Sequence, residues 1–307
     1  MLRRLLLYLS TAAWARSIVT HLGVARRVAL RFVAGETAAD ALNVTNDLNK
    51  RGLLVTLDYL GESVARAEDT EEVVATYRHI IEQIHERGLQ ASVSLKLTHL
   101  GLDISEDLCQ TNLRHILTAA HPHHIPLTID MESSEYVDVT LRIYRTMRDE
   151  YGFDNVGTVI QSYLYRSAED MQQLAAEGAH IRLVKGAYLE PPEIAYPAKA
   201  DVDQNFIQLA DAYLAAPKAA YLCIASHDEN MIQAALTSIE RHAVPPERYE
   251  FQMLYGIRAN RQDELAAAGY KMRLYVPFGE AWYPYFMRRL AERPANLWFF
   301  IRALFGG

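Results

Sequence analysis

Apolar and polar positions alternate regularly along most of this chain. From residue 52 onward, short apolar runs are separated by stretches whose apolar residues recur every three or four positions, as in an amphipathic helix. Thr70–Arg87 and Ala168–Glu177 are two of these stretches. The apolar runs predict eight strands, Leu53–Asp58, Ala91–Lys96, Pro126–Asp130, Asn155–Gln161, Ile181–Gly186, Tyr221–Ser226, Tyr249–Leu254 and Lys271–Val276.

Glycines mark the ends of several predicted helices. Gly88, Gly178 and Gly269 each follow a helical stretch, where a left-handed residue commonly ends a helix. Eight strand–helix units predict an α/β protein, a closed and distorted (βα)8 barrel of the TIM type, and an open doubly wound sheet is the alternative. We expect an N-terminal helical segment over residues 1–50 and a catalytic barrel with a C-terminal helix over residues 51–307.

Alternation within the strands predicts which side chains enter the barrel. In the second strand, Ala91, Val93 and Leu95 form the apolar face and Lys96 lies on the opposite one. Active sites of such barrels lie at the C-terminal ends of the strands, and a buried unpaired charge costs several kcal/mol. We therefore expect a site rather than a structural network of ion pairs, which is the alternative. The predicted interior set is Asp58, Lys96, Asp130, Gln161, Arg182, Gln252 and Tyr275.

The last predicted helix adds cations beside this set. Tyr285, Arg288, Arg289 and Glu292 are spaced i, i+3, i+4 and i+7, so they share one helical face. Paired guanidinium groups suit a carboxylate or a phosphate. An Arg-Arg pair on a helix is more often simply solvated, but its place directly after the eighth strand favours a site.

Composition narrows the classes of function. The 307 residues are 50% apolar and 22% charged, which suits a large buried core, and the net charge of −7 argues against a nucleic-acid partner. Neither Cys109 nor Cys223 has metal-ligand spacing, and no dinucleotide or phosphate-binding glycine motif is present. The cluster of His121, His123 and His124 is only a weak candidate, so we predict no metal site.

The first 35 residues contain six arginines and no acidic residue. No apolar run in the chain reaches the length of a membrane-spanning helix. The use of only two cysteines fits a reducing cytoplasm, where we expect the protein. The basic segment is expected to pack on the main domain, with contact to an anionic membrane surface as the alternative. The proline-containing connection from Tyr188 to about Asp203 has the length of an active-site lid.

Several motifs fall in order on successive predicted strands. They are SVSLKL at 92–97, TIDME at 128–132, RLVKGAY at 182–188, SH at 226–227 and YVPFG at 275–279. With the Tyr285, Arg288, Arg289 and Glu292 pattern, they resemble the short bacterial form of proline dehydrogenase over about residues 40–300. Each motif is modest by itself, but their order is specific.

The resemblance implies a flavoenzyme with FAD as its cofactor. Such an enzyme oxidises L-proline to Δ1-pyrroline-5-carboxylate by hydride transfer from C5 to flavin N5 and passes the electrons to a quinone. This is the first step of proline catabolism to glutamate, with pyrroline-5-carboxylate dehydrogenase as the downstream enzyme. Because that quinone lies in the membrane, a peripheral contact with the inner face of the cell membrane is the alternative that the basic N-terminal segment leaves open.

Residue by residue, the resemblance implies a substrate pocket. Arg288 and Arg289 would bind the proline carboxylate with help from Lys96, and Glu292 would orient an arginine. Asp130 and Arg182 match the family's catalytic pair; Tyr275 and Tyr285 would contact the ring, Tyr275 disfavouring 4-hydroxyproline. The FAD-binding positions would be Met131, Gln161, Arg182, Val184, Lys185, Gly186, Ala187, Ser226 and His227.

Two positions depart from part of the family, and other reactions stay open. Some longer relatives have tryptophan at the position of Leu189, and threonine is common at that of Ser226. A flavin-dependent barrel similar to methylenetetrahydrofolate reductase is the main alternative. A Schiff-base aldolase using Lys96 or Lys185 and a barrel that only binds sugar phosphates are the others.

Overall fold

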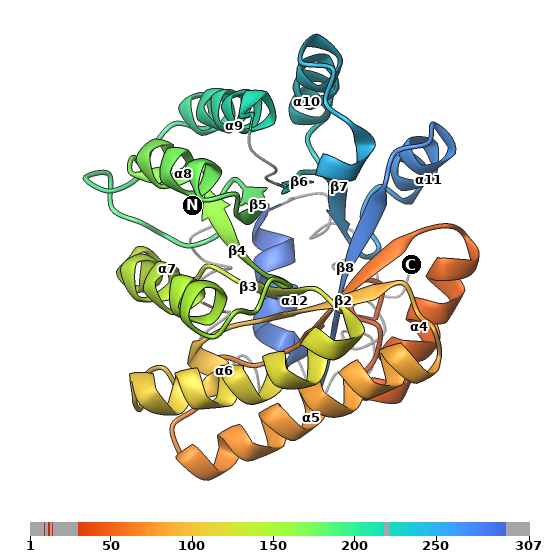
Figure 1. The fold of residues 1–307 in the computed structure, drawn as a ribbon, viewed down its shortest axis with the longest axis vertical. Coiled ribbons are helices and arrows are strands. Elements are labelled where there is room, and N and C mark those ends of the chain that lie inside the picture. Colours follow the sequence, from red (N-terminus) through yellow and green to blue (C-terminus); the bar gives the residue numbers. More distant parts are fainter. Residues whose placement is uncertain (1–8, 10–11, 13, 15–29, 218–220, 293–307) are drawn as a thin grey trace.

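A computed structural model describes Leu9, Ala12, Trp14, residues 30–217 and residues 221–292. For residues 288–292 it describes the backbone alone. Eight parallel strands close into a barrel in sequence order (Figure 1). The predicted (βα)8 barrel is therefore confirmed, and the open sheet is wrong. The strands are β1 Leu54–Tyr59, β2 Ala91–Leu95, β3 Leu127–Ile129, β4 Val156–Gln161, β5 His180–Val184, β6 Tyr221–Ala225, β7 Tyr249–Leu254 and β8 Met272–Phe278.

Helices surround the barrel and alternate with its strands (Figure 1). The prediction for Thr70–Arg87 corresponds to α5, and that for Ala168–Glu177 corresponds to α8. Gly88, Gly178 and Gly269 all have positive φ just beyond their helices, as predicted from their positions. The helices are α4 Ala38–Lys50, α5 Ala67–Glu86, α6 Glu106–Ala120, α7 Val137–Arg145, α8 Ser167–Ala176, α9 Lys199–Ala215, α10 Glu229–Arg241, α11 Ala259–Ala267 and α12 Trp282–Glu292.

Strand register explains how the barrel closes. Thr56 of β1 lies opposite Ser92 on one side and Tyr275 on the other. Strand β8 continues two residues beyond its predicted end because Phe278 still pairs with Tyr59. Alternate side chains such as Val55, Leu57 and Val93 are fully buried under the helices, which leaves the opposite positions for the interior.

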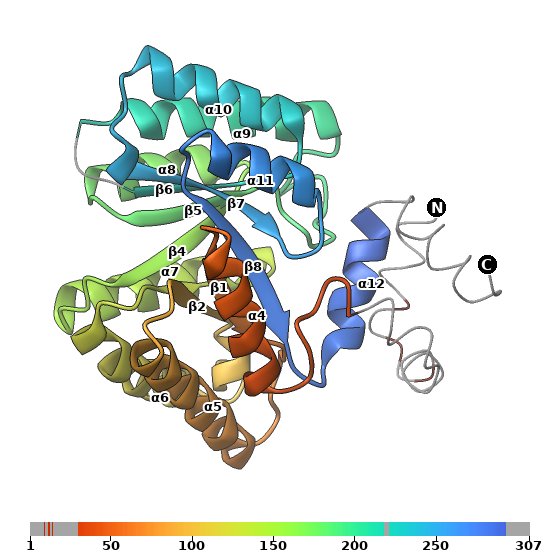
Figure 2. The same ribbon diagram turned by 90° about the vertical axis from the view of Figure 1, so that its right-hand side faces the viewer.

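Helix α12 stands beside the ends of the strands, apart from the ring of outer helices (Figure 2). Its Trp282 and Phe286 pack in a separate apolar cluster with Phe32. The Tyr283 hydroxyl donates to the Leu9 carbonyl at 2.9 Å, so this part of the N-terminal segment contacts α12. Most of the basic N-terminal segment lies outside the described residues. None of the described helices is long and apolar enough to cross a membrane.

Candidate active site

A cluster of acidic, basic and phenolic side chains lies at the C-terminal mouth of the barrel, with Asp130 at its centre. One oxygen of this carboxylate accepts from Arg182 Nη1 at 2.6 Å and from the Ser94 hydroxyl at 2.7 Å. The other accepts from the Tyr275 hydroxyl at 2.7 Å. Arg182 also lies over the Tyr275 ring, 5.2 Å from its centre. Asp130 therefore links side chains of three strands and orients the guanidinium group.

Lys96 occupies the same mouth between two carboxylates. Its Nζ is 3.5 Å from Asp58 and 4.0 Å from Asp130. Burial raises the pKa of Asp58 above its ordinary value, although Lys96 opposes this effect. The predicted interior set is thus brought together, including the ion pairs that the structural alternative anticipated.

Buried polar atoms without a hydrogen-bond partner among the described residues include two that are used below, Arg182 Nη2 and Gln161 Oε1. Gln161 donates through its other amide atom to the Glu132 carbonyl at 3.1 Å. An unpaired buried donor or acceptor costs free energy, so such atoms commonly serve a ligand.

The ends of β5 and β6 form the side of the mouth predicted to hold a cofactor. Gly186 has φ of +113°, and a Cβ there would lie 2.3 Å from the Tyr163 ring, so only glycine fits. Lys185 is held by Asp203 at 2.5 Å and Asp228 at 2.8 Å. These contacts hold the Lys185 ammonium group and the backbone after β5 in a defined position.

The remaining predicted cofactor residues follow neighbouring strands. Met131 comes after β3, while Val184 and Ala187 lie at and after the end of β5. Ser226 accepts from the Asp228 amide at 3.1 Å, and His227 Nε2 accepts from the Leu254 amide at 2.8 Å. A ring nitrogen that accepts carries no proton, which makes Nδ1 the protonated position of the neutral imidazole.

Of the predicted residues on α12, Tyr285 is buried with 5% of its surface exposed. Arg288, Arg289 and Glu292 lie on this helix, but their side chains are outside the described part of the structure. Their predicted contacts with a substrate carboxylate stay predictions.

Three contacts were missed by the sequence analysis. Ser94 joins Asp130 to Arg182, and its place two residues before Lys96 could have indicated this. Asp203 reaches Lys185 because of the path of the connecting loop, and no pattern in the sequence indicates that contact. Glu190 accepts from the Ser134 amide at 2.8 Å and the Ser134 hydroxyl at 2.6 Å, and so attaches the 188–203 connection to the loop after β3.

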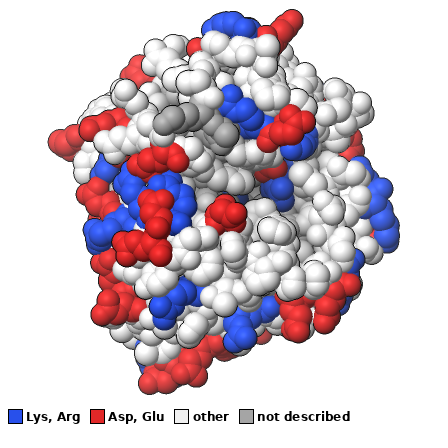
Figure 3. Space-filling view, in the orientation of Figure 1, with Lys and Arg blue, Asp and Glu red and all other residues white. Residues whose placement is uncertain are grey.

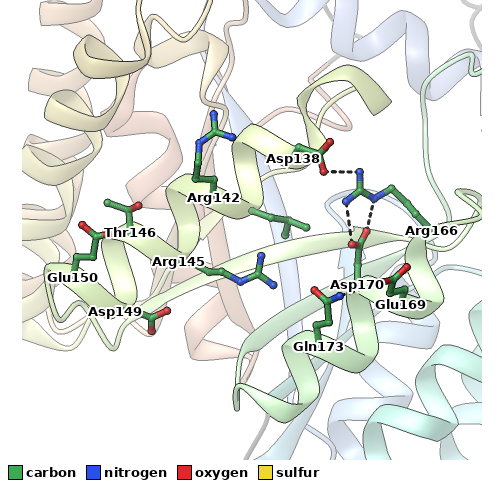
Figure 4. Close-up of a pocket in the computed structure, with 11 residues that line it drawn as sticks. Asp138, Arg142, Arg145, Thr146, Asp149, Glu150, Arg166, Glu169, Asp170 and Gln173 are labelled. Atoms are coloured by element: carbon green, nitrogen blue, oxygen red, sulfur yellow. Dashed lines mark hydrogen bonds and ion pairs between the residues drawn. The ribbon is translucent and has the colours of Figure 1, made fainter.

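Two cavities lie away from this mouth. One, of about 560 Å³, is an outer groove between α7 and α8 (Figure 4). Its Arg166 is paired with both Asp138 and Asp170, which indicates a structural ion network. On the face shown in Figure 3, charges of both signs are interspersed, with a mixed cluster over these helices. The second cavity, of about 620 Å³, lies at the N-terminal end of the barrel.

The histidine cluster forms no metal centre that the described residues reveal. His123 stacks on His85 with ring centres 3.7 Å apart, and His121 lies 3.2 Å from Asp154. Among the residues that the structure covers, no group of three or more potential ligands could hold a metal ion.

Comparison with known proteins identifies the family to which this chain belongs. The proline dehydrogenase family profile matches residues 41–302. Proline dehydrogenase 1 of Bacillus subtilis is 43% identical over 99% of both chains. Proline dehydrogenase of Deinococcus radiodurans is 42% identical over 91% of both chains.

Solved structures of related proteins have the same barrel fold. Proline utilization A of Bdellovibrio bacteriovorus, inactivated by N-propargylglycine, superposes with a TM-score of 0.81 and 26% identity. The match covers 91% of this chain and 34% of that one, so the present chain spans about a third of that protein. Because the family profile, the relatives and the barrel agree, the chain belongs to the proline dehydrogenase family, and it is an oxidoreductase.

Proposed function

We propose that this protein oxidises L-proline to Δ1-pyrroline-5-carboxylate with FAD bound at the mouth of the barrel. The single observation that carries the proposal is the Asp130–Arg182–Tyr275 cluster, which leaves Arg182 Nη2 as a buried donor without a partner in the described residues. The oxidation removes a hydride from C5 and the amine proton, and it leaves a C=N bond.

The residues at the mouth suit a flavin. The unpartnered Arg182 Nη2 and Gln161 Oε1 can bind polar edges of the ring, and Gly186 keeps the backbone after β5 packed on Tyr163 beside this site. FAD, when bound, supplies the two-electron acceptor for the substrate hydride. We assign its binding to Met131, Gln161, Arg182, Val184, Lys185, Gly186, Ala187, Ser226 and His227.

Arg182 and Asp130 act as a unit in this proposal. Arg182 places positive charge where negative charge develops during hydride transfer, and such preorganised groups contribute strongly to rate. Asp130 orients it through a 2.6 Å hydrogen bond. Because burial raises the pKa of Tyr275 well above its ordinary value, the phenol stays protonated and keeps its hydrogen bond to Asp130.

Substrate binding is assigned to α12 and the neighbouring strand ends. Arg288 and Arg289 bind the proline carboxylate, Glu292 orients one of them, and Lys96 adds a third positive charge. Tyr275 and Tyr285 contact the pyrrolidine ring. Tyr275 occupies the space that the hydroxyl of 4-hydroxyproline requires, so Tyr275→Ser is expected to relax that discrimination.

A quinone is the proposed final electron acceptor. Because such quinones lie in the membrane, we propose a cytoplasmic protein with a peripheral contact at the inner face of the membrane. The arginine-rich N-terminal segment is the proposed contact. The product is then a substrate for a pyrroline-5-carboxylate dehydrogenase. Removal of the basic segment should reduce sedimentation with anionic vesicles.

One anaerobic titration tests the central proposal. Purified protein should show flavin absorbance, and L-proline should bleach it with formation of the cyclic imine. A matched titration with glycine, which lacks the pyrrolidine ring, should leave the absorbance unchanged. A colourless protein, or a flavin that proline does not reduce, would contradict the proposal.

A further inference from the structure

A hydrogen-bonded chain crosses the barrel interior from the mouth to its N-terminal end. Arg182 Nε donates to Gln252 Oε1 at 2.7 Å, and Gln252 Nε2 donates to Glu250 Oε1 at 2.6 Å. Arg273 Nε donates to the same Glu250 oxygen at 2.6 Å. Glu250 and Gln252 are two positions apart on β7, so both face the interior. We call Glu250 and Arg273 the floor pair.

The floor pair determines how the Gln252 amide is oriented. Burial alone would raise the pKa of Glu250, but Arg273 and its hydrogen bonds hold that pKa at about 2, so the carboxylate is ionised at neutral pH. An ionised carboxylate only accepts hydrogen bonds. The amide nitrogen of Gln252 must therefore face Glu250, and its carbonyl oxygen must face Arg182.

Arg182 is consequently held at two separate nitrogens. Gln252 accepts from Nε, while Asp130 and Ser94 bind Nη1 at 2.6 and 3.1 Å. A guanidinium group is planar, so fixing these two nitrogens also fixes the direction of the third. That third nitrogen is Nη2, the buried donor without a partner among the described residues.

We propose that Gln252 is a positioning residue for the reaction, acting through Arg182 and itself held by the floor pair. This inference rests on the proposed function, because it assigns Nη2 of Arg182 to the flavin site. Gln252 touches neither substrate nor cofactor in this proposal. Its carbonyl oxygen sets the plane in which Arg182 presents its remaining donors.

The main test replaces the amide by a side chain of similar shape. Gln252→Met removes both hydrogen bonds, so Arg182 loses its fixed plane and stabilises reduced flavin less well. We expect a more negative flavin reduction potential and about tenfold or more slower reduction at saturating proline, with little change in KM. Both are measured on the flavin-loaded enzyme, the potential by dithionite titration against a reference dye.

A matched control separates positioning from general stability. Asn112 is another buried amide, which binds Thr70 and the Leu100 carbonyl outside the barrel interior. Asn112→Leu should lower thermal stability and leave the flavin potential at the wild-type value. An unchanged potential in Gln252→Met, or an equal shift in Asn112→Leu, would overturn the proposal.

A double substitution tests whether Arg182 transmits the effect. In an Arg182→Met background, Gln252→Met should cause no further shift in potential, because the group that it positions is gone. A second shift of full size in that background would show that Gln252 acts by another route and would overturn the proposal.

Gln252→Glu provides a test independent of the methionine variant. Protonated glutamic acid offers a carbonyl acceptor to Arg182 and an O–H donor to Glu250, as the amide does, whereas the ionised form faces the Glu250 carboxylate. Arg182 and Glu250 bond residue 252 directly, Arg273 bonds Glu250, and the titratable groups of His180, Tyr221 and Cys223 also face Glu250. The flavin reduction potential of Gln252→Glu should approach that of wild type, measured at the same pH, as the pH falls. A difference between the two potentials that persists at every pH would overturn the proposal.

These experiments also distinguish failure of this inference from failure of the proposed function. If proline does not reduce the wild-type flavin, the proposed substrate is wrong, while the dithionite potentials still report on Gln252. If proline reduces wild type and the Gln252 variants have wild-type potentials, only the positioning role is wrong.

Discussion

The two ends of the barrel interior are both charged, but they are built differently. At the N-terminal end, Glu250 and Arg273 meet at 2.6 Å, and Arg273 also donates to the Val55 carbonyl. At the mouth, Lys96 lies 3.5 Å from Asp58 and 4.0 Å from Asp130, longer than a strong charge-assisted bond. The floor pair is tightly bonded, whereas the mouth combines a 2.6 Å bond between Asp130 and Arg182 with these longer contacts of Lys96.

The mouth and the floor pair also differ in their unpartnered atoms. In the part of the chain that the structure describes, the buried side-chain atoms without a hydrogen-bond partner include Arg182 Nη2 and Gln161 Oε1, and none belongs to Glu250 or Arg273. A satisfied buried pair maintains the fold, while unused donors and acceptors remain available for a ligand. We therefore expect the floor pair to stabilise the barrel and the charges at the mouth to serve its chemistry.

Glu250→Gln should have the largest effect, and it should be on stability. The substitution leaves Arg273 buried without a negative partner, which costs about 3–5 kcal/mol. Urea unfolding measures the loss. Glu247→Gln, at an exposed position nearby, is the control and should change stability by less than about 0.5 kcal/mol. A loss below about 1 kcal/mol in Glu250→Gln would remove the structural role of the floor pair.

Arg182→Met should act mainly on chemistry. Loss of a preorganised charge at the reacting centre typically slows the step by about 10²–10³-fold. Stopped-flow absorbance of the flavin with saturating proline measures the rate, and circular dichroism checks the fold. Arg142→Met, which breaks an ion pair with Glu106 on the outer surface, is the control and should keep the wild-type rate. A rate within threefold of wild type in Arg182→Met would contradict a role at the mouth.

Acid should affect the two ends in opposite directions. The pKa of Glu250 is lowered from 4.5 to about 2 on folding, so its contribution is present above pH 4.5 and is lost as the pH falls toward 2. That loss is worth about 3 kcal/mol. Asp58 has a raised pKa, so its ionisation opposes folding as the pH rises.

Urea unfolding at a series of pH values between about 2 and 5 would measure this difference. The wild-type protein should lose stability on acidification more steeply than Glu250→Gln does. Asp58→Asn should steepen the acid loss instead. Identical pH profiles for wild type and Glu250→Gln would show that Glu250 is not an ionised, stabilising group.

The smallest effects should come from a matched pair of tyrosines. Tyr221 donates its hydroxyl to Glu250 at 3.1 Å, and Tyr275 donates to Asp130 at 2.7 Å. Each phenylalanine variant should lose about 1 kcal/mol of stability. Tyr275→Phe should also slow flavin reduction by proline, whereas Tyr221→Phe should not. Equal kinetic effects would remove the distinction between mouth and floor.

Much of the fold and part of the site could be predicted from the pattern of the chain. The period of two within each strand placed Lys96, Arg182 and Tyr275 inside the barrel, because alternate side chains point to opposite faces. The same rule applies to Glu250 and Arg273, which lie two positions from Gln252 and Tyr275, but it does not show that they pair. The Lys185–Asp203 contact was not predicted, since it depends on the path of a loop.

The sequence by itself determined the barrel, its interior positions and the family, because the spacing of apolar residues and the order of the motifs are both properties of the linear chain. Only the tertiary structure decided which charges meet. Asp130 and Arg182 are 52 positions apart, and Asp130 and Tyr275 are 145 apart, so their contacts exist only after the strands close. The orientation of the Gln252 amide depends on charges from three strands at once, and that information is absent from any single segment.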